Sequence, residues 1–566
     1  MTPLQDVDPH NSPREETCPI DDLPDELLAY VFQLGVETEQ EGDEDSDSES
    51  SNENQWEDID DDKDSDVLSA DGTSCNSSSL TLNRVISIPT DSDLDDDDDD
   101  RHRDTLPFQV LVSHVCRRWR SVALNSYRFW TILTFCRHPR LVQAKEYISR
   151  SNGLPLTIEL DCSTDDDLDE QELEELSDSD LSEEEKNVLS LDELDQILEL
   201  LQPAISQWGT FIFHASHHDY VRLLMSKLHR LPAALCLESF QVHIYEEWDD
   251  SVFIPAKDDT FWLPFHGQAP NLKEAVFWGI HIDWEGALPN FLSGLRNLEL
   301  SYLTQEARPT YAAFAEIIKN SPELRGLTLS LAGPMLPDDV AFDSDEAWGP
   351  VPLAIPSLTK LVLQFHDPKY AAILVQHLYL PNVTHLVLNF DEEDYSGFVQ
   401  TLANPVKGRS QSLLRQLSYL KISGLPCDIT SVEILLSQLS SLQSLNLKLF
   451  GADEEVIYEK LVDPWSLRIG PASSSLTHSP RVDIPKVFCP KLEEITTVGL
   501  NGPSIKTLVI ARRDAGAPLK RVYMATSQDS DVLTDDERWI KENVEELYFF
   551  DPSDSEEDYD TDDPVA

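Results

Sequence analysis

Two segments near the N-terminus carry apolar residues at helical spacing. In the first, residues 20–34, Pro24 stands where a first-turn proline is tolerated, and Asp25 and Glu26 suit the positive end of a helix. The apolar positions of this segment are Leu27, Leu28, Val31, Phe32 and Leu34. Gly35 follows them and is expected to end the helix.

The second segment begins at Leu106 and reads LPFQVLVSHVCRRWRSVALNSYRFWTIL. Its apolar residues again form one helical face: Leu111, Val112, Val115, Cys116, Trp119, Val122 and Ala123. Neither segment buries enough area alone, so we expect the two to pack on each other or on a partner. Residues 1–19 and the Ser-, Asp- and Glu-rich stretch 36–104 between the segments are expected to be disordered.

From about residue 187 to residue 550 the recurring pattern is L-x-x-L-x-L. Its clear copies are Leu295/Leu298/Leu300, Leu324/Leu327/Leu329, Leu358/Leu361/Leu363, Val383/Leu386/Leu388, Leu417/Leu420/Ile422 and Leu442/Leu445/Leu447. Weaker copies lie at Leu272–Phe277, Leu492–Thr497, Leu519–Met524 and Val544–Phe549. Most copies are about 23–29 residues apart, two spacings are near 34 and one gap is near 50, and a 20–29-residue period is typical of leucine-rich repeats.

Amphipathic helices are predicted between these strands at Thr310–Asn320, Tyr370–Leu378 and Ser431–Leu439. A strand-plus-helix unit leaves its apolar side open and must stack on its neighbours. We therefore expect a short all-α unit followed by an α/β solenoid like a leucine-rich repeat. The alternative is an ordinary α/β protein whose buried strands happen to read L-x-x-L-x-L. The many copies in one order, without a glycine-rich phosphate loop after the first strand, favour the solenoid.

In each copy, the residue between the last two apolar positions should point onto the exposed face of the sheet. This row is Glu299, Thr328, Val362, Val387, Lys421, Asn446, Thr496, Tyr523 and Tyr548. It has no single charge sign, and most of its members are expected to be ordinary solvated residues. The residues that bind a target therefore stay unknown at this point.

Charge changes the picture of possible partners. The formal net charge of the 566 residues is −64, and 48 of the 106 acidic residues lie in three blocks at 37–104, 161–186 and 551–566. Such a field repels phosphate backbones, so we expect no nucleic-acid binding and favour basic proteins as electrostatic partners. Serines followed by an acid three residues later, such as Ser46, Ser50, Ser182 and Ser553, match the pattern that acidophilic kinases phosphorylate.

Little in the sequence points to catalysis, metal or membrane. The eight cysteines show no CxxC pair, and the only histidine cluster, His214, His217 and His218, lacks a second ligand set. There is no GxSxG, P-loop or HExxH motif, so we expect a protein that is not an enzyme and needs no metal or cofactor. The first residues are not expected to be a signal peptide, and no apolar run is long enough to span a bilayer, which favours a cytoplasmic or nuclear location.

The two N-terminal segments together resemble the F-box. The family pattern runs LPxELLxxIF, then VCRxWRxxA and a terminal LW. It is matched by Leu23–Leu28 with Val31 and Phe32, by Val112–Arg120, and by Trp130. The arrangement resembles F-box proteins of mushroom-forming fungi, in which a repeat region follows. Their next segments are similar to Arg150–Ile158 and to Ala204–Trp208.

The chain departs from the F-box pattern in three places. About 70 acidic-rich residues replace the usual short turn between the first two helices, a length whose closure entropy is tolerable because it grows slowly. Tyr127 stands where proline is common, and Phe129 with Trp130 replaces Leu-Trp. The expected organisation is then a disordered 1–19, an F-box at 20–135 interrupted by 36–104, a linker and first strand at 136–162, an acidic disordered segment at 163–186, repeats at 187–550 and an acidic tail at 551–566.

The resemblance implies a role as the substrate-recognition subunit of an SCF-type (Skp–cullin–F-box) ubiquitin ligase. The F-box would dock on a Skp-type adaptor, and through it on a cullin, while the repeats would bind a protein target. By position, the adaptor-binding residues would be Leu23, Pro24, Leu27, Phe32, Val112, Val115, Cys116 and Trp119. Two alternatives remain open: an acidic protein that binds basic partners such as histones through its charge blocks, and an F-box protein that binds the adaptor without assembling a ligase.

Overall fold

The structure, a computed structural model, describes residues 20, 23–46, 107–136, 139–163, 189–244, 262–288, 290–336, 348–390, 393–408, 410–449, 455–464, 487–525 and 533–550. It divides into two compact units, Met1–Ser126 and Tyr127–Ala566. Residues 1–19, 164–186 and most of 36–104, which the sequence predicts to be disordered, lie outside the described residues, and so does the acidic tail at 551–566. No described helix is both long and apolar enough to cross a membrane.

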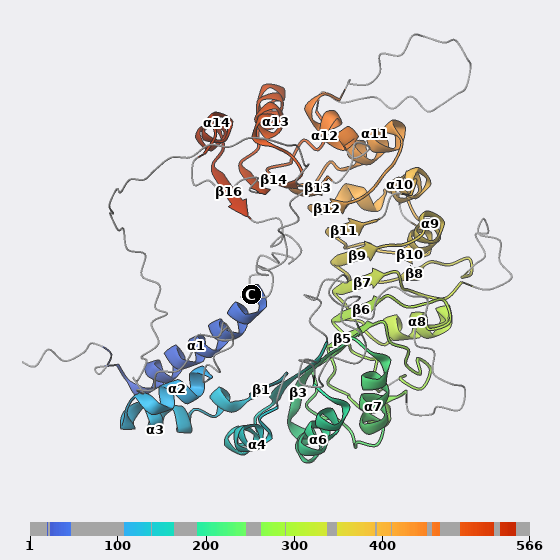
Figure 1. Cartoon of the computed structure of the whole chain (residues 1–566). Coiled ribbons are helices and arrows are strands. Elements are labelled where there is room, and N and C mark those ends of the chain that lie inside the picture. The colour runs from blue at the N-terminus through green and yellow to red at the C-terminus, as the bar shows by residue number, and fades with distance from the viewer. Residues whose placement is uncertain are drawn as a thin grey trace, which may run out of the picture. The chain divides into compact units, whose positions relative to one another are not determined.

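Three helices form the first unit: α1 (Asp25–Ser46), α2 (Phe108–Val115) and α3 (Arg117–Asn125) (Figure 1). The α1 helix contacts both α2 and α3, although about 60 residues separate it from them in the sequence. The buried apolar side chains of the unit are Leu28, Phe32, Val36, Val112, Val122 and Ala123. The two segments that the apolar pattern predicts to pack together therefore do so.

The helix α1 does not end at Gly35, which corrects the sequence prediction. It continues to Ser46, so the first part of the acidic stretch 36–104 is helical, and Val36 belongs to the core. A Cβ atom on Gly35 would overlap ring carbons of Phe108. Gly35 is thus a point of close helix approach, and the Glu and Gln residues after it are good helix formers.

Helices α2 and α3 are separated at Cys116. The apolar pattern of the sequence does not indicate this break. Its backbone is extended (φ −154°, ψ 171°), and its Sγ accepts a hydrogen bond from the backbone N–H of Trp119 at 3.4 Å. The thiol therefore takes the place of the Ser, Thr or Asp that usually caps a helix.

The second unit is built on a 14-stranded parallel sheet in which spatial order follows chain order. The first strands are β1 (Ile132–Phe135), β2 (Leu156–Cys162), β3 (Trp208–Ala215), β4 (Ser239–Ile244), β5 (Glu274–Trp278), β6 (Asn297–Ser301) and β7 (Gly326–Ser330). The others are β9 (Lys360–Gln364), β11 (His385–Asn389), β12 (Tyr419–Ser423), β13 (Ser444–Lys448), β14 (Glu494–Val498), β15 (Arg521–Ala525) and β16 (Glu546–Phe550). The short strands β8 (Leu353–Ala354) and β10 (Leu378–Tyr379) form a separate parallel pair.

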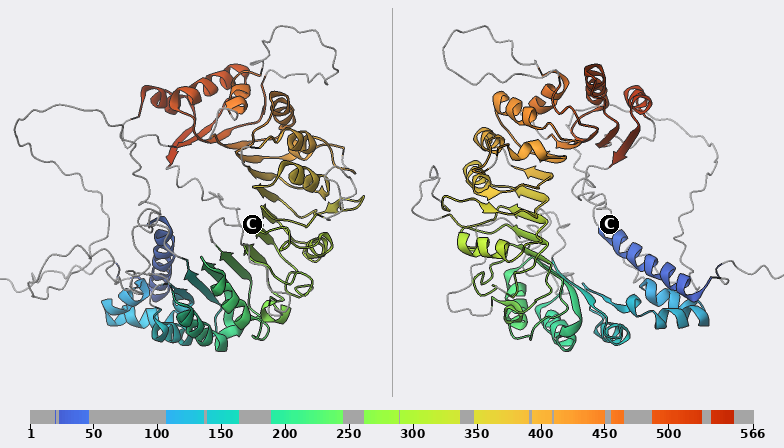
Figure 2. Two further views of the ribbon diagram at one scale, coloured as in Figure 1. Left: turned by 45° about the vertical axis from the view of Figure 1, so that its right-hand side comes forward. Right: turned by 180° about the vertical axis from the view of Figure 1, so that it is seen from behind.

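Helices connect the strands and cover one face of the sheet, so the unit is an α/β solenoid (Figure 2). They are α4 (Leu141–Arg150), α6 (Leu191–Leu201), α7 (His218–Leu228), α8 (Tyr311–Lys319), α9 (Pro368–Gln376), α10 (Ser396–Ala403), α11 (Ile429–Gln438), α12 (Glu455–Val462), α13 (Gly502–Ala515) and α14 (Asp535–Asn543). Short 3-10 turns are η2 (Tyr127–Trp130), η3 (Gln202–Gln207), η4 (Pro264–Gly267) and η5 (Leu413–Gln416). The strand register aligns the repeat leucines, for example Leu361 with Leu327 and Leu386.

The sheet begins earlier than the leucine pattern indicates. The residues 136–162 contain helix α4 as well as β2, and β3 and β4 bury aromatic side chains where later repeats bury leucine. Trp208 stacks on Phe211 at 5.0 Å, and its indole N–H donates to the carbonyl of Leu201. Trp130, placed in the F-box by the sequence, packs on Tyr147 of α4 at 5.0 Å, within the repeat unit.

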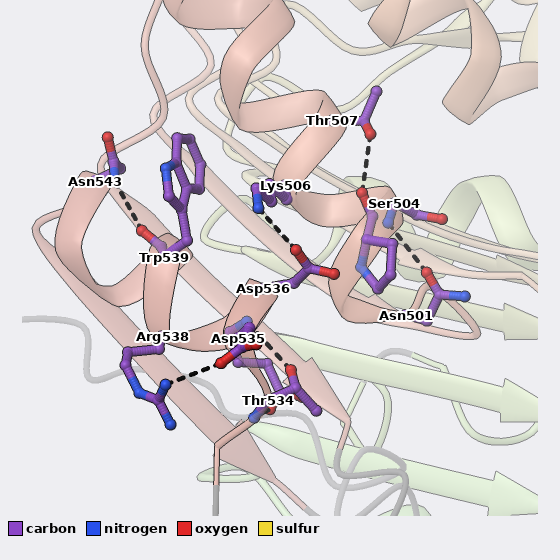
Figure 3. A network of polar contacts seen from close by, with 12 residues as sticks. Asn501, Ser504, Lys506, Thr507, Thr534, Asp535, Asp536, Arg538, Trp539 and Asn543 are labelled. Carbon is purple, nitrogen blue, oxygen red and sulfur yellow. Dashed lines mark hydrogen bonds and ion pairs between the residues drawn. The ribbon is translucent and has the colours of Figure 1, made fainter.

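Polar contacts between α13 and α14 hold the last two repeats together (Figure 3). The Lys506 ammonium donates to Asp536 at 2.7 Å and also lies over the ring of Trp539. The Arg513 guanidinium lies over the same ring, 5.6 Å from its centroid. At the start of α14, Thr534 and Glu537 form a capping box. The final strand of the described chain, β16, pairs with β15 alone.

Candidate functional site

The helix α1 carries two apolar faces. One holds Leu28, Phe32 and Val36 and is buried against α2 and α3. The other holds four side chains at helical spacing that are exposed: Leu27, Tyr30, Val31 and Leu34. A helix needs one apolar face to join a small bundle, so the second face is available for a partner.

Helix α2 adds two exposed apolar side chains to the same unit. We call the six residues Leu27, Tyr30, Val31, Leu34, Leu111 and Val115 the apolar surface; each is between 43% and 61% exposed. Isolated exposed leucines are ordinary in soluble proteins, but six large exposed apolar side chains on two helices of one small unit are not. This surface is the candidate docking site of the first unit.

Polar contacts fix the start of α1 beside α3. The Arg118 guanidinium lies 2.9 Å from the Asp25 carboxylate and also donates to the backbone carbonyl of Leu23. Next to this ion pair, the rings of Phe32 and Trp119 are 5.0 Å apart. The contacts set the rotation of α1 and so decide which of its residues face outward.

The structure separates the adaptor-binding residues predicted from the sequence into two groups. Pro24, Leu27, Val115 and Cys116 are exposed, and Leu23 and Trp119 are partly exposed. Phe32 and Val112 are at most 4% exposed, so within this unit they support the surface from beneath. Sequence reasoning did not select Tyr30, Val31, Leu34 and Leu111 as contacts. The spacing of Leu27, Tyr30, Val31 and Leu34 was the signal that could have found them.

The second candidate surface is the side of the repeat sheet without helices, which we call the open face. Figures 1 and 2 show the helices of the repeat unit on the opposite side of the strands. Each five-residue strand gives the open face its first, third and fifth residues, since alternate side chains point to opposite faces. The buried second and fourth residues form the core.

A ladder of rings runs along one end of the open face. His214 stacks on His243 at 4.7 Å, His243 lies 5.6 Å from Trp278, and Trp278 stacks on Tyr302 at 5.0 Å. Burial lowers the pKa of the His214 imidazole, although the nearby Asp161 carboxylate acts to raise it. Burial and the neighbouring His214 lower the pKa of His243 to about 4, so this imidazole is neutral at pH 7. The side chain of His243 therefore contributes a neutral ring surface.

Charge is segregated along the open face. Strands β2 to β6 present four carboxylates there and no Lys or Arg: Glu159, Asp161, Glu274 and Glu299. Strands β9, β11, β12 and β13 present three lysines and no Asp or Glu: Lys360, Lys421 and Lys448. On β14 and β15 the charges are paired, with Arg521 2.6 Å from Glu494. The row of third residues of the strands, which has no single charge sign in the sequence, does not by itself show this separation of charge.

No group of three or more described His, Cys, Asp or Glu side chains is placed to hold a metal ion. The pKa of the Cys162 thiol and that of the Cys489 thiol are raised by burial, which keeps both thiols protonated and unreactive. The arrangement offers two surfaces for protein binding.

Comparisons with known proteins find likenesses in solved structures. No family model matches the chain, and no match was found among the curated proteins. One solved structure with a likeness is the Rad7–Elc1 complex of yeast, with 12% identity, a TM-score of 0.30 and coverage of 63% of this chain and 79% of that one. Another is the leucine-rich repeat-containing protein LegL7 from Legionella pneumophila, with 11% identity, a TM-score of 0.29 and coverage of 56% and 94%. At these TM-scores, the repeat fold rests on the strand register of the chain itself.

Proposed function

We propose that the chain is a substrate-recognition subunit of an SCF-type ubiquitin ligase. The first unit is its F-box and docks on a Skp-type adaptor, and the repeat unit binds the protein to be modified. The chain contributes specificity and no catalytic group of its own. The ubiquitin-transfer chemistry belongs to the enzymes recruited through the cullin.

The observation that carries this proposal is the apolar surface on a unit that already has a packed core. Because Leu28, Phe32 and Val112 fill that core, the exposed Leu27, Val31 and Val115 are not needed to fold it. Large apolar side chains in a small rigid unit are what the centre of a protein interface requires. The resemblance of the two segments to the F-box suggests a Skp-type adaptor as the partner of this surface.

The test is binding of the purified full chain to a Skp-type adaptor, measured by calorimetry. Leu27→Asp with Val115→Asp places two charges on the apolar surface and is expected to weaken binding by about 100-fold or more. Val142→Asp is the matched control, because Val142 is a highly exposed valine on α4 of the repeat unit. Equal binding by both variants would rule out docking through the apolar surface.

Recovery of partners from cell extract distinguishes this proposal from the alternative functions. A ligase subunit brings down adaptor and cullin together, and the Leu27→Asp/Val115→Asp variant loses both. Recovery of the adaptor without cullin would instead indicate an F-box protein outside a ligase.

A second function, binding of a basic protein, is favoured by one observation. The open face of β2 to β6 combines four carboxylates with the aromatic side chain of Trp278 and no Lys or Arg. Carboxylates beside aromatic faces suit lysine and arginine side chains. The test is recovery of basic proteins from cell extract. This function is supported if Glu274→Gln with Glu299→Gln abolishes the recovery and the Leu27→Asp/Val115→Asp variant leaves it unchanged.

A further inference from the structure

The last strand of the repeat sheet, β16, has a free edge. Among the strands that the structure describes, it pairs with β15 only. The N–H of Glu546 donates to the carbonyl of Lys520, on the β15 side. Because successive residues of a strand turn their N–H and C=O groups to opposite sides, those of Leu547 and Phe549 point towards the open edge. Backbone groups exposed in this way can pair with a further strand.

The apolar core is also partly open at this end of the sheet. The second and fourth residues of β14 and β15 are at most 2% exposed: Ile495, Thr497, Val522 and Met524. The corresponding residues of β16, Leu547 and Phe549, are partly exposed, since no described strand lies on their outer side. At the other end of the sheet, Leu133 and Phe135 of the edge strand β1 are at most 3% exposed. The terminal repeat of a solenoid needs a cover for its apolar side, and at β16 this cover is incomplete.

The open-face side of β16 offers a ring and a carboxylate. Tyr548, its third residue, is 49% exposed and stacks on Tyr523, with the ring centroids 5.1 Å apart. Glu546, its first residue, is exposed. The Arg521 guanidinium acts on Glu546 electrostatically but forms its ion pair with Glu494. A carboxylate beside a tyrosine ring suits the cation of a lysine or arginine side chain.

Acidic charge dominates the chain on both sides of this strand. Glu542 and Glu545, which precede β16, are exposed. Residues 551–566, which follow it, contain eight Asp or Glu residues and no Lys or Arg. This charge acts against pairing with a second copy of the chain, because the edge of that copy would carry the same charge. It attracts a segment of the opposite charge.

We propose that the edge of β16 binds an extended segment of the target protein in which basic and apolar residues alternate. The segment adds a further parallel or antiparallel strand to the sheet. Its apolar side chains cover Leu547 and Phe549, and its Lys or Arg side chains lie beside Glu546 and Tyr548 on the open face. The inference rests on the proposed function, since the bound segment belongs to the protein to be modified.

A fluorescent peptide of alternating lysine and valine residues tests the proposal, by anisotropy with the full chain. It is expected to bind about tenfold or more tightly than a peptide of the same composition whose lysines and valines form two blocks, because the alternating order alone matches both sides of β16. The two peptides have equal charge, so general attraction to the acidic segments does not distinguish them. A peptide of alternating glutamate and valine should not bind.

Phe549→Pro removes the outward N–H and is expected to weaken binding of the alternating peptide by about tenfold or more. The bonds to β15 stay, because proline is tolerated where the N–H of an edge strand faces outward. Phe549→Val keeps the N–H and is the matched control, with an expected loss of about threefold or less. Hydrogen exchange of the β15 amides checks that each variant keeps its fold.

A second variant alters exposed side chains and leaves the backbone as it is. Glu546→Gln with Tyr548→Ala is expected to weaken binding about tenfold, because it removes the carboxylate and the ring that receive the lysines. Tyr127→Ala is the control and should not change binding, since Tyr127 is 46% exposed and lies outside β16.

Adaptor binding by the same proteins separates this inference from the proposed function. The β16 variants should bind the Skp-type adaptor normally, and the Leu27→Asp/Val115→Asp variant should bind the peptide normally. If the unaltered chain binds the peptide and no adaptor, the ligase role fails and the role of the β16 edge stands. If it binds the adaptor and no peptide, the inference about the edge fails alone.

Three further results would overturn the proposal. One is equal binding of the alternating and block peptides. Another is peptide binding that both β16 variants leave unchanged. The third is a dimer of the unaltered chain in analytical ultracentrifugation that Phe549→Pro dissociates, which would make a second copy the occupant of the edge.

Discussion

At Gly35 the absence of a side chain lets two helices approach closely. Glycine in a helix costs about 1 kcal/mol relative to alanine, so it is expected only where packing requires it. The ring of Phe108 occupies the space that a Cβ atom would need. The contact joins two segments separated by the acidic insertion, so it closes a long loop.

Gly35→Ala is expected to destabilise the first unit by about 1–3 kcal/mol despite its better helix propensity, because the methyl group overlaps the Phe108 ring. Hydrogen exchange of the α1 amides measures the effect. Gly397→Ala is the matched control, since Gly397 lies in α10 with no atom within 4 Å of an added Cβ. Addition of Phe108→Ala should relieve the overlap; if both glycine variants behave alike, close approach is not the role of Gly35.

His366 is a buried histidine that the fold keeps neutral. Its Nε2 lies 3.0 Å from the carbonyl oxygen of Leu329, to which it donates, and its side chain lies near the Arg308 guanidinium. Burial, followed by the charge of Arg308, lowers its pKa from 6.5 to about 3. Between these two pH values, protons bind the unfolded chain in preference to the folded one.

Unfolding free energy should therefore fall as the pH is lowered from about 6.5 towards 3. His366→Gln can still donate to Leu329 but cannot take up a proton, so its melting temperature should depend less steeply on pH in this window. Thermal unfolding at a series of pH values measures the slope. A slope unchanged by His366→Gln would contradict the assignment.

Among the elements, α11 and α12 are joined by a buried ion pair. The Lys460 ammonium donates to the Glu433 carboxylate at 2.9 Å, and the two side chains are 0% and 7% exposed. Breaking such a pair leaves a buried charge without its counter-ion, which costs more than the pair itself contributes. The pair sets how the helices of two successive repeats align.

Lys460→Met is expected to lower the unfolding free energy by about 3–5 kcal/mol, because it removes the counter-ion of Glu433. Adding Glu433→Leu should recover much of this loss. Urea unfolding of the full chain, followed by exchange of the α11 and α12 amides, measures both. Lys319→Met at the exposed Glu316–Lys319 pair should cost under about 1 kcal/mol; equal losses at the two sites would refute the buried-pair account.

For the molecule as a whole, the sequence predicted the repeat architecture well wherever leucine fills the core. The helix predicted at Thr310–Asn320 is α8, Tyr311–Lys319, with Thr310 as its cap. Strands β3 and β4 were not recognised as repeats because Phe211, Phe213 and Phe240 stand in place of leucine. A pattern based on one residue type misses copies that fill the same volume with another.

The docking surface could be predicted only in part. Helical spacing shows that α1 is apolar on several sides, but the side that stays exposed depends on contacts with α2 and α3, far away in the sequence. The segregation of charge on the open face depends in the same way on strand register. Lys360, Lys421 and Lys448 occupy the first, third and fifth places of their strands, and only the aligned sheet brings them into one strip.

The matching order of strands in the sheet and in the chain has a consequence for synthesis of the protein. Each strand of the large sheet pairs with strands that come just before and after it in that sheet along the chain. Such a unit needs no contact between its two ends to become stable, because each repeat adds to the one before. A newly made repeat can thus settle on its predecessor while the ribosome is still translating the next, and apolar strands spend little time exposed to the crowded cell.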